Sequence, residues 1–517
     1  MTSWMFVQSV KMKISCMMVV FAAAGVSLSA AAGEGAPEAR RVMNIVNFVR
    51  GCEPRYEYDL VKPLVEEVAL NTKYHFPNTI LLQYDAMLRD DLMRAAKAAE
   101  PELTEYGVWF ETCRALVEKV GLTWRGREGW DWDWYINPGF LMAYTHAERE
   151  KLIDEVFRLF REKFGANPKS VGSWLLDAYS MDYMVRKYGV KGFCICREQD
   201  NTDAYGLRGG YFNGAYYPSK KNMLSAATDM ANAVKAPVFK MLTPDPIYNY
   251  AQSIVPDCAQ GCPTMEPVWL GGYRRDIVDW YFRVYTGKGL LNLSYMQTGQ
   301  ENSFGWDAIG KGLPYQAEVI AKYRAEGKLT VERMCDTAER FAKDHPCNCP
   351  QTQVALEDWN GKAKSVWYNS RFYRANLLLE GGKLRFRDIH KMCDDFEEPF
   401  LDKPCAGWQA LYFTPPVADE YLFRTTGRFE PLAFKGTCTG LEVETLSGDR
   451  LKVTATFRPE SGLFSTVARI EFDETGIVVA RAEFSRVFKS ADYEFNGYRY
   501  RVDVRPMCDA VRIDLSR

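Results

Sequence analysis

Short, almost continuous apolar segments alternate with amphipathic segments between residues 42 and 300. The apolar segments are 42–49, 79–85, 106–110, 170–176, 192–196, 237–242 and 289–295. Such segments predict strands that are buried on both faces. Helices are predicted between them, for example at 58–71, 88–99 and 145–164, where apolar residues recur at helical spacing. Thr145 and Glu148 have the spacing of a capping box, which predicts the start of the last of these helices.

Repeated strand-helix units predict an α/β fold, either a (β/α) barrel or an open parallel sheet. The periodicity fits a seven-stranded and an eight-stranded barrel equally well. Polar residues gather where the predicted strands end, for example Arg50, Glu53 and Arg55 after the first strand. In parallel α/β folds the active site forms at the carboxyl ends of the strands, so this pattern is typical of an enzyme.

The pattern changes after residue 328. A mostly helical stretch runs to Asp344, and Pro346 and Pro350 then interrupt it. Further on, apolar and polar residues alternate in Leu451–Phe457, and Asn496-Gly497 is a strong hairpin signal. We therefore expect a (β/α) barrel at 42–328, a helical linker at 329–350 and an antiparallel β-sandwich at 351–517.

The N-terminus has the layout of a secretory signal peptide. Lys11 and Lys13 precede an apolar run at 14–28, and the small residues 29–32 follow it. This predicts a signal peptide at 1–32, a secreted or periplasmic protein, and no membrane association after cleavage. The apolar run is short for a membrane span.

Composition limits the possible ligands. The 65 basic residues balance the 67 acidic ones, so no nucleic-acid or anionic membrane partner is predicted. Aromatic residues make up 14% of the chain and include 13 tryptophans, which suits a site for a polyhydroxylated ligand. Most cysteines are expected to be buried apolar residues, and the exceptions are the pairs Cys258 with Cys262 and Cys347 with Cys349. A zinc site of four cysteines is the alternative for these pairs, although their spacings do not match the usual zinc knuckles.

Tryptophan lies close to carboxylates throughout 106–203, which suggests binding of sugar rings and chemistry on their oxygens. Glycoside hydrolysis needs two carboxyl groups, one protonated and one ionised. Glu111 and Asp177 rank first, because each directly follows an apolar strand that contains a tryptophan, and Glu301 is the alternative second acid. The acids at predicted strand ends are Glu53, Asp85, Glu111, Asp177, Asp200, Asp203, Asp245, Glu266 and Glu301.

Aromatic residues of the loop at 124–134 are candidates for sugar stacking. Trp130, Trp132 and Trp134 alternate with aspartates, so an extended backbone would place the three rings on one side. A loop that packs its rings onto the domain is equally compatible with this pattern. Further predicted substrate-binding residues are Glu53, Asp85, Trp109, Trp174, Arg197, Asp200, Tyr217 and Trp306.

Other catalytic chemistries lack their residues. The chain has four histidines, and no two lie within one helical turn, which excludes HxxxH and HExxH zinc sites. No GxSxG motif is present either. We therefore predict no catalytic metal and no cofactor, although a calcium ion bound by carboxylates stays compatible with the sequence.

The segments Tyr188-Gly-Val through Arg197-Glu-Gln-Asp200, Tyr216-Tyr-Pro-Ser219 and Gln300-Glu-Asn-Ser-Phe-Gly-Trp306, followed by a β-sandwich, resemble a known group. They are similar to uncharacterised bacterial secreted proteins near the polysaccharide deacetylases and the glycoside hydrolases of families 57 and 38. The resemblance covers residues 42–320 and implies a seven-stranded (β/α) barrel.

Two departures from that group affect the implied chemistry. The HxxxH metal motif of the deacetylases is absent, and no histidine occurs in 47–53, where family 57 enzymes have one on the first strand. The resemblance still implies metal-free glycosidase chemistry by a Glu and an Asp. In this chain the pair corresponds to Glu111 and Asp177. The sequence thus predicts a secreted glycoside hydrolase. The alternatives are an inactive polysaccharide-binding protein and a carbohydrate deacetylase with an atypical site.

Overall fold

The computed structural model describes residues 38–249, 263–458 and 465–516, without the side chains of 200–202. The predicted signal peptide at 1–32 and the pair Cys258 and Cys262 lie outside these ranges. No helix within the described ranges has the length and apolar character needed to cross a membrane.

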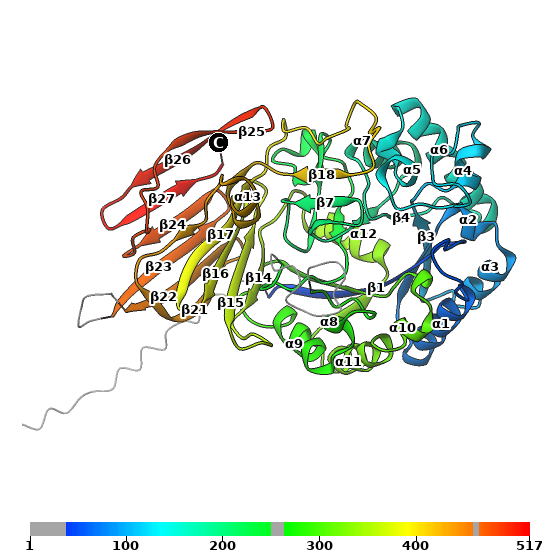
Figure 1. Cartoon of the computed structure of the whole chain (residues 1–517). Helices are drawn as coiled ribbons and strands as arrows, with labels where there is room; N and C mark the ends of the chain where they lie inside the picture. The colour runs from blue at the N-terminus through cyan, green and yellow to red at the C-terminus, as the bar shows by residue number, and fades with distance from the viewer. Residues whose placement is uncertain (1–37, 250–262, 459–464, 517) are drawn as a thin grey trace, which may run out of the picture. The chain divides into compact units, whose positions relative to one another are not determined.

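Seven parallel strands, in the order β12-β1-β2-β3-β4-β5-β11, make up most of a nine-stranded N-terminal sheet. Strands β1, β3 and β4 of this sheet are labelled in Figure 1. The short strands β8 (Ala215–Tyr216) and β13 (Thr330–Glu332) pair with β11 and β1. The mixed α/β fold with a parallel sheet is therefore confirmed. The parallel strands are β1 (Arg40–Val49), β2 (Asn78–Leu82), β3 (Thr104–Trp109), β4 (Ser170–Gly172), β5 (Gly192–Ile195), β11 (Val238–Lys240) and β12 (Leu293–Thr298).

The two outermost parallel strands, β11 and β12, approach each other through side chains. Phe239 and Tyr295 stack with ring centroids 4.8 Å apart. The Thr243 hydroxyl accepts a hydrogen bond from the Gln297 amide at 2.8 Å and donates one to the Gln297 carbonyl at 2.9 Å. Backbone pairing between β11 and β12 is not found among the described residues, so a closed barrel is not shown.

Helices flank the parallel strands, and α1, α10 and α11 lie side by side (Figure 1). The capping box predicted at Thr145 and Glu148 is confirmed, and it starts the longest helix, α6. The helices of this part are α1 (Val61–Tyr74), α2 (Tyr84–Met87), α3 (Asp90–Lys97), α4 (Arg114–Lys119), α5 (Ile136–Gly139), α6 (His146–Phe164), α7 (Ala178–Tyr188), α8 (Leu270–Tyr273), α9 (Arg275–Tyr285), α10 (Trp306–Ile309), α11 (Leu313–Ala325) and α12 (Met334–Asp344), with 3-10 turns η1 (Leu141–Ala143), η2 (Met230–Asn232) and η3 (Asn302–Phe304).

Three expectations about element boundaries were wrong. Strand β4 ends at Gly172, so Asp177 does not end a strand but is the N-cap of α7. Strand β12 begins at Leu293, four residues after the predicted start. The predicted linker at 329–350 contains β13, which pairs with β1, as well as α12. In each case the local apolar pattern does not specify where pairing with a neighbouring strand begins or stops.

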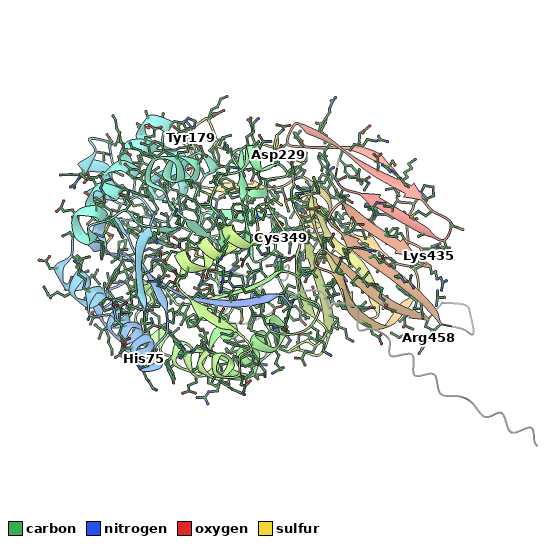
Figure 2. The ribbon with its side chains drawn as sticks, turned by 180° about the vertical axis from the view of Figure 1, so that it is seen from behind. His75, Tyr179, Asp229, Cys349, Lys435 and Arg458 are labelled. Atoms are coloured by element: carbon green, nitrogen blue, oxygen red, sulfur yellow. The ribbon has the colours of Figure 1, made fainter. Side chains whose placement is uncertain are left out.

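Two antiparallel sheets make up most of the C-terminal region, where Lys435 and Arg458 are found (Figure 2). Apolar side chains of both sheets share one core, in which Tyr368 stacks on Phe472 at 5.4 Å. The first sheet contains β14 (Gln351–Ala355), β15 (Ala363–Asn369), β16 (Tyr373–Glu380), β17 (Lys383–Lys391), β19 (Pro416–Asp419) and β20 (Leu432–Ala433). The second contains β21 (Thr437–Ser447), β22 (Arg450–Arg458), β23 (Thr466–Asp473), β24 (Gly476–Ala480), β25 (Ala491–Phe495), β26 (Tyr498–Pro506) and β27 (Ala510–Asp514), and α13 (Glu420–Thr426) follows β19.

A hairpin of the N-terminal part pairs with a strand from the C-terminal region. β6 (Gln199–Thr202) and β7 (Tyr205–Arg208) form the hairpin, and β18 (Ala410–Phe413) lies parallel to β7. Two further strands, β9 (Pro218–Ser219) and β10 (Asn222–Ala226), form a small separate pair. The sequence pattern predicted neither these strands nor the pairing across two hundred residues.

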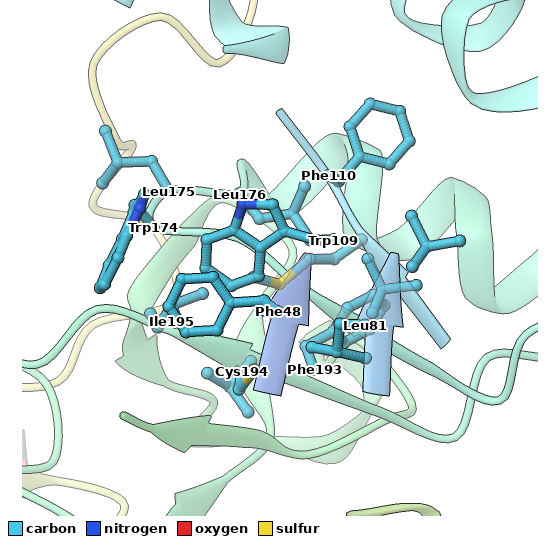
Figure 3. Packing of buried hydrophobic residues seen from close by; sticks show 14 of the residues in the cluster. Phe48, Leu81, Trp109, Phe110, Trp174, Leu175, Leu176, Phe193, Cys194 and Ile195 are labelled. Carbon is cyan, nitrogen blue, oxygen red and sulfur yellow. The ribbon is translucent and has the colours of Figure 1, made fainter. Parts of the chain in front are cut away.

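Large side chains fill the space near the ends of β1, β3 and β5. Phe48 stacks on Trp109 with ring centroids 4.0 Å apart, and the edge of each ring meets Trp174 at 5.3 Å (Figure 3). A Cβ atom on Gly172 would lie 2.5 Å from the Leu81 side chain and 2.8 Å from the sulfur of Cys194. Glycine is therefore required there, because the packing leaves no room for a side chain.

Candidate active site

Arg50 lies directly after β1 and binds carboxylates from two other strand ends. Its Nε donates to Glu111 Oε2 at 2.9 Å, and its Nη2 donates to Glu111 Oε1 at 3.2 Å. On the other side of the guanidinium, Nη1 lies 2.7 Å from Glu301 Oε2. All three residues are at most 3% exposed. Two carboxylates thus share one guanidinium, which compensates their charge inside the protein.

Trp109 fixes the position of Glu111. The indole Nε1 donates a hydrogen bond to Glu111 Oε2 at 2.8 Å, and the ring itself is held by stacking on Phe48. Together with the two bonds from Arg50, Glu111 accepts three hydrogen bonds from buried donors. Its carboxylate is therefore held in one orientation.

Glu301 is in a different electrostatic environment. Burial raises the pKa of Glu301 above its ordinary value, and Glu111 adds to this rise, while Arg50 and Arg55 oppose it. Glu301 therefore keeps its proton to a higher pH than an exposed glutamate does. A carboxyl group of this kind suits a general acid.

The two carboxylates line a small pocket with a volume of about 40 Å³. Six of its eleven lining residues are aromatic. Asp203, which also lines the pocket, is accessible to solvent. Partial desolvation and the nearby Glu301 raise the pKa of Asp203. The pocket residues are Arg50, Arg55, Glu111, Trp132, Trp134, Phe140, Trp174, Asp203, Tyr205, Glu301 and Phe304.

The tryptophan-rich loop is held in place by arginines. Trp132 is 1% exposed and lies under the Arg50 guanidinium at 3.9 Å. Arg127 covers Trp130 at 3.6 Å and Trp134 at 4.0 Å, and it forms two hydrogen bonds with Asp133. Trp132 and Trp134 line the pocket, whereas Trp130 packs on Arg127 outside its lining. The three rings therefore do not form one open face for stacking.

Asp177 is not brought to this pocket. Its Oδ1 accepts from Arg149 Nη1 at 2.8 Å and from the Ser180 amide at 2.9 Å, and its Oδ2 accepts from the Ser180 hydroxyl at 2.7 Å. Asp177 is fully buried, so these contacts leave no surface for a substrate. The geometry fits a helix cap and a buried ion pair.

Several other predicted binding residues have structural contacts away from the pocket lining. Glu53 binds Arg55, Asp85 accepts from the amides of Gly51 and Ala86, and Tyr217 donates to the carbonyl of His345. Arg197 is buried, Trp306 begins α10, and Asp200 lies in β6 with its side chain outside the described residues. Of the predicted set, Glu111, Glu301, Trp132, Trp134 and Trp174 meet at one pocket.

Sequence reasoning missed several pocket residues. Arg50 and Arg55 were noted at a strand end but were not assigned to the site, although a cation beside strand-end acids was an available signal. Asp203 was among the strand-end acids and was not selected. Phe140, Tyr205 and Phe304 come from loops, and nothing in their local pattern indicates that they converge.

None of the four histidines, all of which lie in the described residues, lines the pocket. A group with metal-ligand geometry, Asp388, His390 and Asp419, occurs instead in the C-terminal region. Its donors are already used, because Arg374 binds both oxygens of Asp388 and His390 Nε2 lies 2.8 Å from Asp419 Oδ2. Cys347 and Cys349 are free thiols.

No protein-family profile matches the sequence, and no curated protein matches it. Among solved structures, a glycoside hydrolase/deacetylase-type protein from Parabacteroides distasonis is similar, with a TM-score of 0.56 and 14% identity over 76% of this chain and 94% of that chain. A polysaccharide deacetylase-type protein from Pseudomonas aeruginosa matches with a TM-score of 0.34 and 12% identity, over 60% of this chain and 93% of that chain. A 4-alpha-glucanotransferase from Thermococcus litoralis matches with a TM-score of 0.26 and 9% identity, over 92% and 97% of the two chains. The chain therefore shares its fold with the first of these proteins.

Proposed function

We propose that the chain is a carbohydrate-active enzyme that hydrolyses glycosidic bonds. The observation that carries the proposal is the pair Glu111 and Glu301, which lie on opposite sides of one guanidinium and face the same aromatic pocket. Their separation is limited to the width of a guanidinium group plus two polar contacts. Glycosidases hold their carboxyl pair about 5 to 9.5 Å apart, and this upper limit is compatible with that range.

The two carboxyl groups would have different roles. Glu301, whose pKa is raised by burial, gives its proton to the oxygen of the leaving sugar. Glu111, fixed by Arg50 and Trp109, acts on the anomeric carbon, either directly or through a water molecule. Trp134, Trp174 and Phe304 supply apolar walls for the sugar ring.

Substitution of the two glutamates tests these roles. Purified protein is assayed on a panel of polysaccharides and aryl glycosides for reducing ends and released aglycone. Glu301→Gln and Glu111→Gln are each expected to lower the rate by at least about 100-fold, as loss of an acid-base group does. Glu128→Gln, an exposed residue of the tryptophan-rich loop, is the control and keeps the wild-type rate. Full activity in either glutamate variant would contradict the assignment, and Asp203→Asn then tests the other pocket acid.

Binding without cleavage is the second candidate. Arg50 occupies the space between the two carboxylates, and the pocket volume of about 40 Å³ is small for a sugar ring. In that case the wild-type protein is retained by a polysaccharide in affinity electrophoresis but releases no product. Release of acetate from an acetylated polysaccharide would instead indicate a deacetylase.

Export of the protein rests on the sequence of residues 1–32 alone. We propose that cleavage near Ala32 releases the protein into the periplasm or the medium. Determining the N-terminus of the protein recovered from those fractions tests this. An N-terminus at Met1 or Met12 would contradict cleavage.

A further inference from the structure

Exposed aromatic side chains continue from the pocket in two directions. Large apolar side chains are usually buried, yet Tyr56 is 57% exposed, Tyr58 is 45% exposed and Trp408 is 49% exposed. Tyr56 and Tyr58 belong to one segment beside the pocket residues Arg55 and Phe304, whereas Trp408 comes from a distant segment and reaches the pocket residue Trp134 through Tyr135. Their clustering around one opening indicates a binding surface.

On one side the surface begins at Trp134, which lines the pocket. The ring of Tyr135 lies 5.6 Å from Trp134, and the ring of Trp408 lies 4.9 Å from Tyr135. The Trp408 carbonyl accepts a hydrogen bond from the Ile136 amide at 3.1 Å, which fixes this C-terminal residue beside the tryptophan-rich loop. The C-terminal region therefore contributes directly to the surroundings of the pocket.

On the other side the surface begins at Arg55 and Phe304, which also line the pocket. The Arg55 guanidinium lies between the rings of Trp134 at 5.2 Å and Tyr56 at 5.8 Å. Tyr56 and Tyr58 are 5.3 Å apart, and Tyr58 packs against Gly305, next to Phe304. The successive spacings are comparable to the length of one pyranose unit.

The two arginines beside these rings are each paired with a buried carboxylate, whereas the carboxylates Glu57 and Asp59 beside Tyr56 and Tyr58 are exposed. Arg55 Nε donates a hydrogen bond to Glu53 Oε1 at 2.7 Å, and Arg127 Nε donates one to Asp133 Oδ2 at 2.8 Å. Both of these accepting carboxylates are buried, and the exposed carboxylates disfavour a polymer that carries carboxylate or sulfate groups. The aromatic faces fit a ligand that is apolar on its ring faces and polar at its edges.

We propose that Tyr56, Tyr58, Trp134, Tyr135 and Trp408 form an aromatic track that binds a neutral polysaccharide chain across the pocket. This inference rests on the proposed carbohydrate function and adds the substrate class, a neutral chain that extends beyond the pocket on both sides. The track predicts that affinity increases with chain length.

Affinity electrophoresis in gels that contain glucan, mannan, xylan or galactan tests the track. The measurements use Glu301→Gln protein, in which the proposed general acid is removed, so that retention is observed without cleavage. Trp408→Ala and Tyr58→Ala are each expected to weaken retention by the best neutral polysaccharide by about tenfold, and the double variant further. Phe423→Ala removes an aromatic ring that is 38% exposed on α13, away from the track, and is the matched control.

Three results would overturn the proposal. The first is equal retention of the track variants and the control. The second is stronger retention by polygalacturonate than by every neutral polysaccharide. The third is a dimer that dissociates on Trp408→Ala, measured by size-exclusion chromatography with light scattering, because the exposed rings would then be a contact between two copies. Loss of cleavage in Glu301→Gln together with normal track-dependent binding supports both proposals separately.

Discussion

Glu398 is a buried acid whose side chain binds the start of helix α7 and strand β10. Its two oxygens accept hydrogen bonds from the Ala178 amide at 2.9 Å and the Met223 amide at 2.7 Å. Burial, and next the nearby Asp177, raise the pKa of Glu398 from 4.5 to about 8. The folded protein therefore holds this proton at pH values where the unfolded chain has released it.

This difference predicts how stability depends on pH. Between the unfolded pKa and the folded pKa the native state binds more protons, so the free energy of unfolding falls as pH rises from 4.5 towards 8. The titration of this one group lowers the free energy of unfolding by at most about 1.4 kcal/mol per pH unit. Glu398→Gln removes this titrating group. The free energy of unfolding of the variant, measured by chemical denaturation at pH 5, 6, 7 and 8, should therefore depend less on pH than that of the wild type.

Glu397→Gln is the control for this measurement, because its side chain is 54% exposed and pairs with Lys221 on the surface. That variant should keep the pH dependence of the wild type. If Glu398→Gln kept it too, the proton would not reside on Glu398.

At the scale of elements, helix α7 depends on Asp177. Asp177→Asn keeps an oxygen for capping but leaves the buried Arg149 without its counter-ion. Removing one partner of a buried pair costs about 3 to 5 kcal/mol. We expect a loss of this size in the free energy of unfolding, measured by urea denaturation, without a specific loss of catalytic rate in the protein that remains folded.

Asp182→Asn in the same helix provides the comparison, because Asp182 pairs with the exposed Arg186. This substitution should lower the free energy of unfolding by less than about 1 kcal/mol. Unchanged stability and lost activity in Asp177→Asn would instead return Asp177 to the catalytic role predicted from the sequence.

Elements defined by local signals were predicted well. The Asn496-Gly497 turn has φ values of 50° and 79°, which the hairpin between β25 and β26 requires, and the capping box of α6 is present as expected. Convergence of distant residues was not predictable in this way. Arg50 meets Glu111 across 61 positions, and nothing around either residue specifies the other as its partner. The strand-end rule therefore found Glu111 and Glu301 but could not exclude Asp177 or select Arg50.

At the scale of the whole molecule, a buried charge network joins the two regions. Arg374 in β16 donates to both oxygens of Asp388 and also pairs with Glu198, which follows β5. Glu198 in turn accepts from the Gly209 amide at 3.0 Å, at the end of the β6–β7 hairpin. The C-terminal region thus helps to position the hairpin that carries Asp203 and Tyr205.

Arg374→Met is expected to lower the free energy of unfolding by about 3 to 5 kcal/mol, because it removes a buried guanidinium that pairs with two buried carboxylates. Hydrogen exchange measured by mass spectrometry should also become faster at 199–209. Arg371→Met removes a half-exposed pair with Glu474 and should change both quantities little. Unchanged exchange in Arg374→Met would show that the network does not support the hairpin.

The pairing of β18 with β7 also affects how the chain reaches its native state. Tyr205, a wall of the pocket, lies in a strand whose partner, Ala410 to Phe413, comes about two hundred residues later. Such a contact must close a very long loop, and native contacts of high sequence separation form slowly. The parallel sheet can therefore fold while synthesis continues, but the pocket is completed only after most of the chain has been made. Premature termination after Glu301 but before Ala410 would remove the partner of β7 even though every proposed catalytic residue had been translated.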